Sequence, residues 1–206
     1  MIPVIEQLAA QTRVPISIDT MKPGVARAAL AAGASIVNDV GANREDPGMW
    51  EITAAAGAGY VCMHMQGTPR TMQERPEYRD VVAEIVTFLS SRIEQLHRCG
   101  IESDQIIVDP GIGFGKTVEH NLELLGGLNA FAVLNRPLLV GVSRKSFLGK
   151  LSGAEPESRL APALACACLA VEAGVNLLRV HDVQETVQAV RMAEAILARR
   201  RTPVKT

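Results

Sequence analysis

Short runs of β-branched and aliphatic residues recur along the chain, and each run ends in a polar group capable of chemistry. The six runs are Pro15–Asp19, Ile36–Asp39, Tyr60–His64, Ile106–Asp109, Leu138–Lys145 and Leu177–Asp182. Between them lie stretches rich in Ala, Leu, Glu and Arg, with apolar residues at helical spacing. This alternation predicts a parallel sheet, and barrels of this kind keep their active sites at the carboxyl ends of the strands.

Glycine positions and loop lengths support a barrel. Gly33, Gly59 and Gly174 each stand a few residues before a strand run, where a glycine ends a helix cheaply in the left-handed conformation. The links from strand to helix are longer and more polar, as in residues 65–73, and barrels build their working face from such links. We expect helices to begin near Pro23 and to span Val81–His97 and Val183–Arg199.

Six strands are two fewer than a closed barrel requires. The chain begins in a helix-like stretch, residues 2–10, with no strand run before it. We therefore expect an α/β fold, a TIM-type (β/α)₈ barrel in which about six of the eight βα units are present and the first two are missing. Residues 1–206 contain no linker-like segment and are expected to form one barrel domain. Unpaired edge strands would make such a chain prone to aggregation.

Composition narrows the class of protein. The 206 residues are 48% hydrophobic, enough for a sizeable core, and a formal net charge of −1 gives no reason to expect nucleic acid or a membrane surface as partner. We find no signal peptide and no apolar run long enough to cross a bilayer, so a cytoplasmic location is expected. The four cysteines, Cys62, Cys99, Cys166 and Cys168, do not have the spacing of a zinc or redox motif.

Polar residues at the strand ends suggest a site for a flat heterocycle. Asp19, Asn38 and Asp109 could each be a turn former or a helix cap, but together they offer donors and acceptors for the edge of a nitrogen heterocycle. The glycines of residues 111–115 would let the backbone pass close to such a ligand, and Phe114 is available to stack on it. A phosphate-binding loop is disfavoured here, because proline precedes Gly111 where that loop requires glycine.

Basic residues after the last two runs suggest an anion site. Arg179 and His181 alternate, so they face the same side of the last strand, and Lys145 and Ser146 follow the preceding run. Barrels commonly bind phosphate near the loops after their last two strands, and the alternative is a solvated basic rim. His64 could face a ligand or be a hydrogen-bonded core histidine, and the sequence leaves both interpretations open.

These stretches together resemble the dihydropteroate synthase family of the folate pathway, which has a pterin-binding (β/α)₈ barrel. In the family's order, the matching stretches are Ile16–Thr20, Ile36–Asp39, Met63–Gly67, Asp109–Lys116, Gly141–Gly149 and Arg179–Val183. The resemblance implies condensation of 6-hydroxymethyl-7,8-dihydropterin diphosphate with p-aminobenzoate, giving 7,8-dihydropteroate and pyrophosphate.

The resemblance also implies roles for individual residues. The positions that match the pterin pocket are Asp19, Asn38, Asp109 and Lys145. Arg179 and His181 match positions that hold the diphosphate, and Phe114 and Ser146 match positions near p-aminobenzoate. Met65 and Gly141 lie in matching stretches and are expected to contact substrate. The residues expected to be catalytic are Asp19, Asp109, Lys145, Arg179 and His181.

Family properties outside these residues are implied as well. They are Mg²⁺ as cofactor, a homodimer of the full-length chain and sensitivity to sulfonamides. The family's Asn metal ligand lies in the N-terminal units that we expect to be missing, so no metal ligand is expected within residues 1–206. Two alternatives remain: a pterin-binding methyltransferase of the methyltetrahydrofolate type, and an inactive truncated remnant of the synthase.

Overall fold

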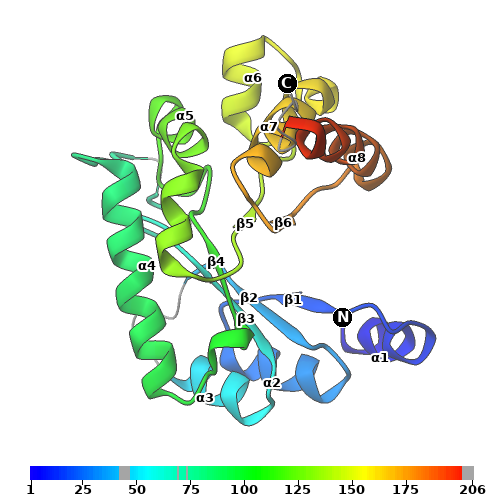
Figure 1. The fold of residues 1–206 in the computed structure, drawn as a ribbon. Coiled ribbons are helices and arrows are strands. Elements are labelled where there is room, and N and C mark those ends of the chain that lie inside the picture. The colour runs from blue at the N-terminus through cyan, green and yellow to red at the C-terminus, as the bar shows by residue number, and fades with distance from the viewer. Residues whose placement is uncertain (42–46, 69, 73, 201–206) are drawn as a thin grey trace, which may run out of the picture.

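The computed structural model describes residues 1–41, 47–68, 70–72 and 74–200. Short strands alternate with helices along the chain (Figure 1). The strands are β1 (Ser17–Asp19), β2 (Ile36–Asp39), β3 (Gly59–Met63), β4 (Ile106–Asp109), β5 (Leu139–Val140) and β6 (Leu177–Leu178). The helices are α1 (Ile2–Gln11), α2 (Pro23–Ala31), α3 (Gly48–Ala55), α4 (Val81–Arg98), α5 (Val118–Gly126), α6 (Ser146–Ser152), α7 (Leu160–Glu172) and α8 (Val183–Arg200), with 3-10 helices η1 (Ser103–Gln105), η2 (Leu128–Leu134) and η3 (Pro156–Ser158).

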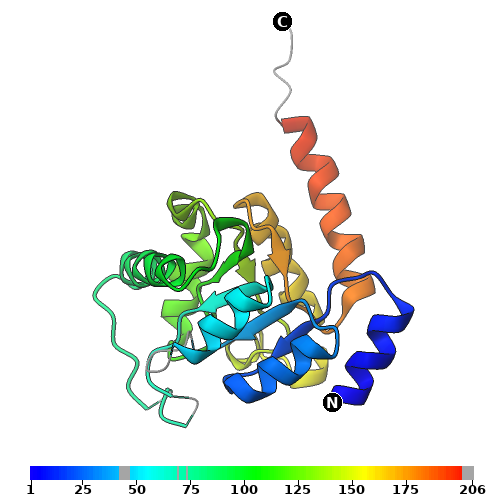
Figure 2. The same cartoon turned by 90° about the horizontal axis from the view of Figure 1, so that it is seen from below.

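The strands lie side by side in sequence order, and every pair is parallel. Strands β1 to β4 form one hydrogen-bonded sheet, and β5 pairs with β6. A bridge between Val108 and Leu138 joins β4 to β5, with the Val108 N–H donating to the Pro137 carbonyl at 2.9 Å. The helices lie around the outside of the strands (Figure 2). The structure thus confirms the α/β class and the six βα units of a partial (β/α)₈ barrel.

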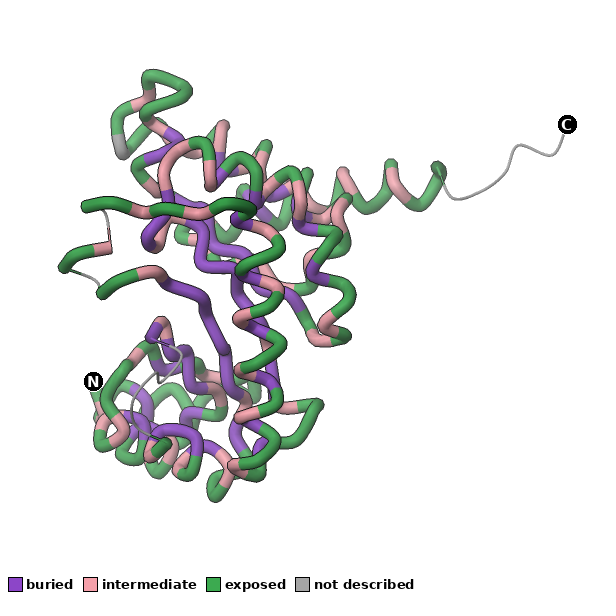
Figure 3. Tube along the Cα trace, turned by 90° about the vertical axis from the view of Figure 1, so that its left-hand side faces the viewer, coloured by how far each residue is buried: buried purple, intermediate pink, exposed green. Residues whose placement is uncertain are grey.

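Alternation along the strands separates an inner face from an outer face. The outer face carries apolar side chains that pack against the helices and form the main core; among them are Ile18, Val37, Tyr60, Cys62 and Val108. The parallel register places Asp19 beside Asn38 and Met63 beside Asp109, and these residues occupy the opposite, inner face. Buried backbone therefore runs through the centre of the molecule, with exposed backbone at its periphery (Figure 3).

Helix α4 shows how local sequence sets an element. Asp80 caps its start by accepting the Ala83 N–H at 2.9 Å, and the Glu84 carboxylate accepts the Arg79 and Asp80 N–H groups. Apolar residues then recur at helical spacing, and Val81, Ile85, Leu89, Ile93 and Leu96 are buried. Among the described residues, no helix is both long enough and apolar enough to span a membrane.

The predicted boundaries agree with the structure to within two residues except at three places. Helix α2 begins at Pro23, and Gly33 and Gly174 adopt positive φ angles of 110° and 91° at helix ends, as predicted. Gly59 was expected to end a helix, and that prediction is wrong: Gly57 has the positive φ of 60°, and Gly59 begins β3. Strands β5 and β6 are shorter than their predicted runs, because the backbone ladder stops at Val140 and Leu178.

Candidate active site

The carboxyl ends of β1 and β6, the outer strands of the order, meet through an ion pair. Arg179 Nη2 donates to Asp19 Oδ2 at 2.9 Å, with side-chain exposures of 57% and 50%. A pair this exposed contributes at most about 1 kcal/mol. Asn38 is the register neighbour of Asp19 on β2. The ion pair therefore shows that the carboxyl ends of β1 and β6 lie on one side of the molecule, which we call the mouth. The stability of the fold comes from the hydrophobic core and not from this pair.

Asp109 is the buried carboxylate of this mouth. It is 7% exposed, and its Oδ1 accepts the Gly111 N–H at 2.7 Å. Burial raises the pKa of Asp109, and the positive charges of Lys145, Lys116 and Arg179 oppose that rise. The cations thus favour an ionised carboxylate at a position where burial alone would favour the acid.

Lys145 comes from the start of α6 and reaches across to the loop after β4. Its Nζ donates to the Ile112 carbonyl and lies 4.7 Å from the centroid of the Phe114 ring. Burial lowers the pKa of Lys145 to about 8, and the Arg179 charge acts in the same direction, while Asp109 opposes both. The ammonium is therefore a cation whose charge changes close to neutral pH.

The glycine-rich loop after β4 packs directly on the loop after β3. At Gly111, where φ is +69°, an added Cβ would lie 1.9 Å from the His64 carbonyl oxygen. At Gly115, where φ is +64°, it would lie 2.5 Å from the Gln66 carbonyl oxygen. Only glycine meets both the left-handed conformation and this backbone approach. The glycines thus serve loop-to-loop packing, a role that differs from the ligand approach expected from the sequence.

Lys116 fastens the same two loops together. Its side chain is 3% exposed, and its Nζ contacts His64 Nδ1 at 3.1 Å and donates to the Phe114 carbonyl at 2.9 Å. The His64 ring also packs edge-on against Phe88, with centroids 4.9 Å apart. His64 is therefore a hydrogen-bonded core histidine, which decides between the two interpretations left open by the sequence.

Asn38 presents a buried amide to the inner face. Its neighbour Asp39 points outward, where the carboxylate accepts the Tyr60 hydroxyl at 2.7 Å and the Gly41 N–H at 2.9 Å. The Trp50 indole donates to the same Tyr60 hydroxyl at 2.9 Å. Asn38 Oδ1 is buried and has no hydrogen-bond partner among the described residues. Because an orphaned buried acceptor is costly, this oxygen suits a ligand donor.

His181 and Arg144 have partners that the sequence reasoning missed. Ser143 Oγ lies 2.9 Å from His181 Nδ1, and Arg144 pairs with Asp182 at 2.9 Å. The strand register that pairs Leu139 with Leu177 would have found both contacts, because the same offset of 38 residues aligns the ends of the last two runs. The burial of Lys116 could not be predicted in this way, since a lysine at the end of a loop is ordinarily exposed to solvent.

The remaining predicted residues lie around this centre. Met65 is 2% exposed and sits between His64 and Gln66, whose side-chain amide bonds both backbone groups of Glu77. Gly141 is buried beside Arg179, with 3.5 Å between an added Cβ and the Arg179 Cβ. Ser146 is exposed and lines a cavity of about 390 Å³ with residues that include Gly113 and Lys116.

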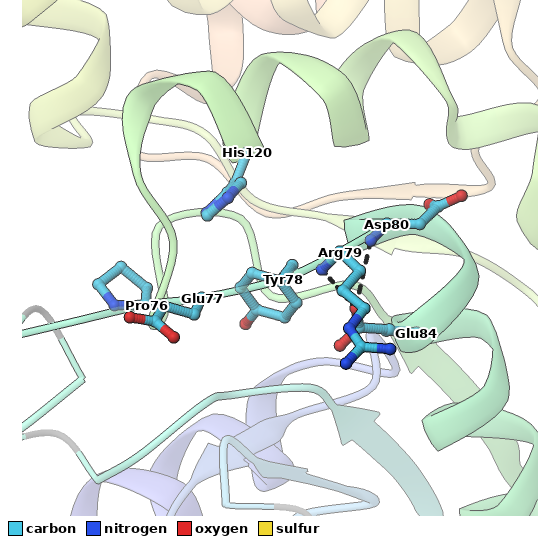
Figure 4. A pocket seen from close by; sticks show the side chains of 7 residues that line it. All are labelled: Pro76, Glu77, Tyr78, Arg79, Asp80, Glu84 and His120. Carbon is cyan, nitrogen blue, oxygen red and sulfur yellow. Dashed lines mark hydrogen bonds between the residues drawn. The ribbon is translucent and has the colours of Figure 1, made fainter.

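A separate cavity of about 860 Å³ is lined by residues 76–80, the last part of the loop between β3 and α4, and by His120 (Figure 4). Its lining residues are Pro76, Glu77, Tyr78, Arg79, Asp80, Glu84 and His120. Tyr78 stands edge-on to His120 with ring centroids 5.0 Å apart, and its hydroxyl donates to the Gly115 carbonyl at 2.9 Å. None of the predicted site residues lines this cavity, and its wall supports the glycine-rich loop from behind.

The residues that the structure describes lack a cluster of metal-binding side chains. They contain no group of three or more His, Cys, Asp or Glu side chains that could hold a metal ion. Asp19 is paired with Arg179, and Asp109 is surrounded by cations. The positive charges beside both carboxylates make them poor ligands for a cation.

We predict that Gly111→Ala destabilises the protein strongly. The positive φ and the approach of 1.9 Å to the His64 carbonyl both penalise a Cβ, together by about 3–5 kcal/mol. Gly24→Ala is the matched control, because nothing lies within 4 Å of a Cβ at that helical position. Urea unfolding of the two variants measures the difference, and equal midpoints would contradict the packing described for this loop.

Comparison with known proteins agrees with this geometry. The pterin-binding enzyme family model matches residues 1–181. Dihydropteroate synthase of Escherichia coli K12 is 46% identical over 197 residues, which cover 96% of this chain and 70% of that enzyme. Two crystal structures of Xanthomonas albilineans dihydropteroate synthase each superpose with a TM-score of 0.89 and cover 96% of this chain. The structure with 4-aminobenzoic acid is 46% identical and 70% covered, and the complex with 7,8-dihydropteroate is 45% identical and 72% covered. The chain belongs to the pterin-binding enzyme family, among the dihydropteroate synthases.

Proposed function

We propose that this chain condenses 6-hydroxymethyl-7,8-dihydropterin diphosphate with p-aminobenzoate to give 7,8-dihydropteroate and pyrophosphate. The observation that carries the proposal is the mouth itself, where Asp19, Asp109, Lys145 and Arg179 gather in a chain 46% identical to a dihydropteroate synthase. That identity favours the synthase over the methyltransferase alternative. The same carboxylate and cation arrangement suits displacement of a diphosphate from a heterocycle.

The pterin half of the site is built on the inner face. The unpartnered amide oxygen of Asn38 accepts a pterin N–H, and the Asp109 carboxylate accepts another. Lys145, whose charge also acts on Asp109, donates to the ring next to Phe114. Met65 and Gly141 bound the pocket through buried positions beside these groups. A flat ring with donors and acceptors along one edge fits this set of side chains.

The diphosphate half is built at the ends of β5 and β6. A guanidinium carries five N–H donors, so the bond from Arg179 to Asp19 leaves others for phosphate oxygens. His181 adds a ring donor. When the amine nitrogen of p-aminobenzoate attacks the pterin methylene carbon, the bond from that carbon to the diphosphate oxygen breaks, and the nitrogen then gives up one proton to solvent. Cations then stabilise the leaving anion, while Asp19 and Asp109 stabilise positive charge on the carbon.

The rest of the assignment follows the family. Ser146 and Phe114 are assigned to the p-aminobenzoate side, next to the cavity of about 390 Å³. Mg²⁺ is proposed to bind together with the diphosphate, since hard cations bind phosphate oxygens. The chain is also proposed to act as a single barrel domain in the cytoplasm. A homodimer is proposed as well, and the exposed apolar residues Leu169, Met192 and Ile196 on α7 and α8 support it.

The reaction is tested by incubating the 206-residue chain with the pterin diphosphate and p-aminobenzoate. Formation of dihydropteroate together with pyrophosphate is expected, and sulfonamide should compete with p-aminobenzoate. Asp109→Asn should lower kcat/KM by about 10²-fold or more, because the buried charge near the reacting carbon is lost. Glu94→Gln, on the exposed surface of α4, should leave the rate unchanged. Pterin binding without turnover would support the inactive remnant.

Asn38→Ala should separate binding from stability. The amide oxygen makes no hydrogen bond within the described residues, so its removal should change the free energy of unfolding by less than about 1 kcal/mol. Binding of 6-hydroxymethylpterin, measured by calorimetry, should weaken about tenfold. A large loss of stability with unchanged pterin binding would show that Asn38 is a structural residue.

The pH dependence should report the Lys145 ammonium. With a pKa of about 8, this side chain is charged below that pH and neutral above it. If the charged form donates to the pterin, kcat/KM falls as pH rises through about 8. Lys145→Arg keeps its charge throughout this range, so the alkaline fall should disappear from the profile of that variant. An identical fall in Lys145→Arg would assign the titration to another group.

A further inference from the structure

The last two strands stay in register beyond their backbone ladder. Residues that differ by 38 in number are paired in β5 and β6, as with Leu139 and Leu177. Below the strands, Asn176 Oδ1 accepts the Leu138 N–H at 2.9 Å, again with an offset of 38. Gly141 lies against Arg179 at the same offset. The side chains therefore continue a pairing that the backbone begins.

Two side-chain contacts continue the register of β5 and β6 as far as the mouth. Ser143 Oγ lies 3.3 Å from the backbone nitrogen of His181 and 2.9 Å from its Nδ1. One position further, Arg144 and Asp182 form an ion pair at 2.9 Å. Ser143 is only 8% exposed, while His181 is exposed, so a buried residue anchors an accessible one.

Ser143 Oγ has two lone pairs and one proton, and its two contacts leave that proton free to donate to His181 Nδ1. The His181 backbone N–H can only donate, so Ser143 Oγ accepts that bond. The hydroxyl then has one proton to donate, and Nδ1 is its hydrogen-bond partner among the described residues. In a neutral ring, a hydroxyl that donates to Nδ1 places the imidazole proton on Nε2, at the ring edge away from Ser143.

We propose that Ser143 is a positioning residue that orients the His181 ring and keeps its Nε2–H aimed at the diphosphate. The inference rests on the proposed function for its ligand, and its structural part stands on the two contacts alone. A neutral ring with the opposite tautomer would present a lone pair to phosphate oxygens and repel them. With Ser143 in place, His181 donates from Nε2 whether the ring is neutral or charged.

The orientation is tested by nitrogen NMR on protein with ¹⁵N-labelled histidine, at a pH where the His181 ring is neutral. The His181→Gln variant assigns the signal among the four histidines. In the wild-type protein, Nε2 should be protonated, and Nδ1 should show the shift of a hydrogen-bonded acceptor. In Ser143→Ala, Nδ1 should move to the shift of a solvent-exposed ring. Ser143→Thr, which retains the hydroxyl, should restore the wild-type signal.

Arg144→Ala is the matched control, because it breaks the next contact in the same register without touching His181. It should leave the His181 signals unchanged. A protonated Nδ1 in the wild-type protein, or an Nδ1 shift that Ser143→Ala does not alter, would overturn the proposal. Circular dichroism of each variant shows whether the fold is kept, and the Thr variant decides the matter if the Ala variant unfolds.

Binding of inorganic pyrophosphate separates this proposal from the proposed function. Ser143→Ala should weaken pyrophosphate binding about fivefold, as expected for one neutral hydrogen bond. Equal affinities of wild type and Ser143→Ala would overturn the positioning role and leave the synthase assignment standing. No pyrophosphate binding by the wild-type protein would overturn the diphosphate assignment for Arg179 and His181, while the NMR result would still report the contact of Ser143 with the ring.

Discussion

The arrangement of the site depends on the parallel register of the strands. Successive side chains of a strand point to opposite faces of the sheet. A shift of one residue in the register would therefore turn the core side chains toward the site and the site side chains toward the helices. Val37 and Asn38 show the consequence: the first packs against helices, and the second faces the mouth. Asp39 then returns to the outer face, where Tyr60 and Gly41 bind its carboxylate. The outward bonds hold β2 in register and so hold Asn38 inward.

A second constraint fixes the height of the candidate site residues above the sheet. The glycine-rich loop after β4 lies so close to the loop after β3 that a Cβ at Gly111 or Gly115 would collide with carbonyl oxygens. Tyr78 joins the two loops through the Gly115 carbonyl, and Lys116 joins them through its contacts with His64 and the Phe114 carbonyl. The packed backbone of the two loops therefore fixes the position of the Phe114 ring, against which the Lys145 ammonium lies.

The sequence predicted the order of strands and helices well, because each run has a clear apolar period and a glycine or proline at its boundary. It also predicted that polar side chains lie at the carboxyl ends of the strands, as at Asp19 and Asp109. It did not predict that Lys116 is buried or that Ser143 touches His181, since both depend on contacts between distant segments. The Gly59 error has a local cause: two glycines stand close together, and the backbone uses Gly57 for the left-handed turn.

The ion pair between Asp19 and Arg179 joins residues 160 positions apart. Closing a loop of that length costs roughly 4 kcal/mol of chain entropy, several times what an exposed pair returns. The pair therefore cannot draw the two ends of the chain together; it forms after the intervening strands have been laid down one beside another. During refolding, the ability to bind substrate should therefore appear late. It should appear when the last strand joins the others and not when any single helix forms.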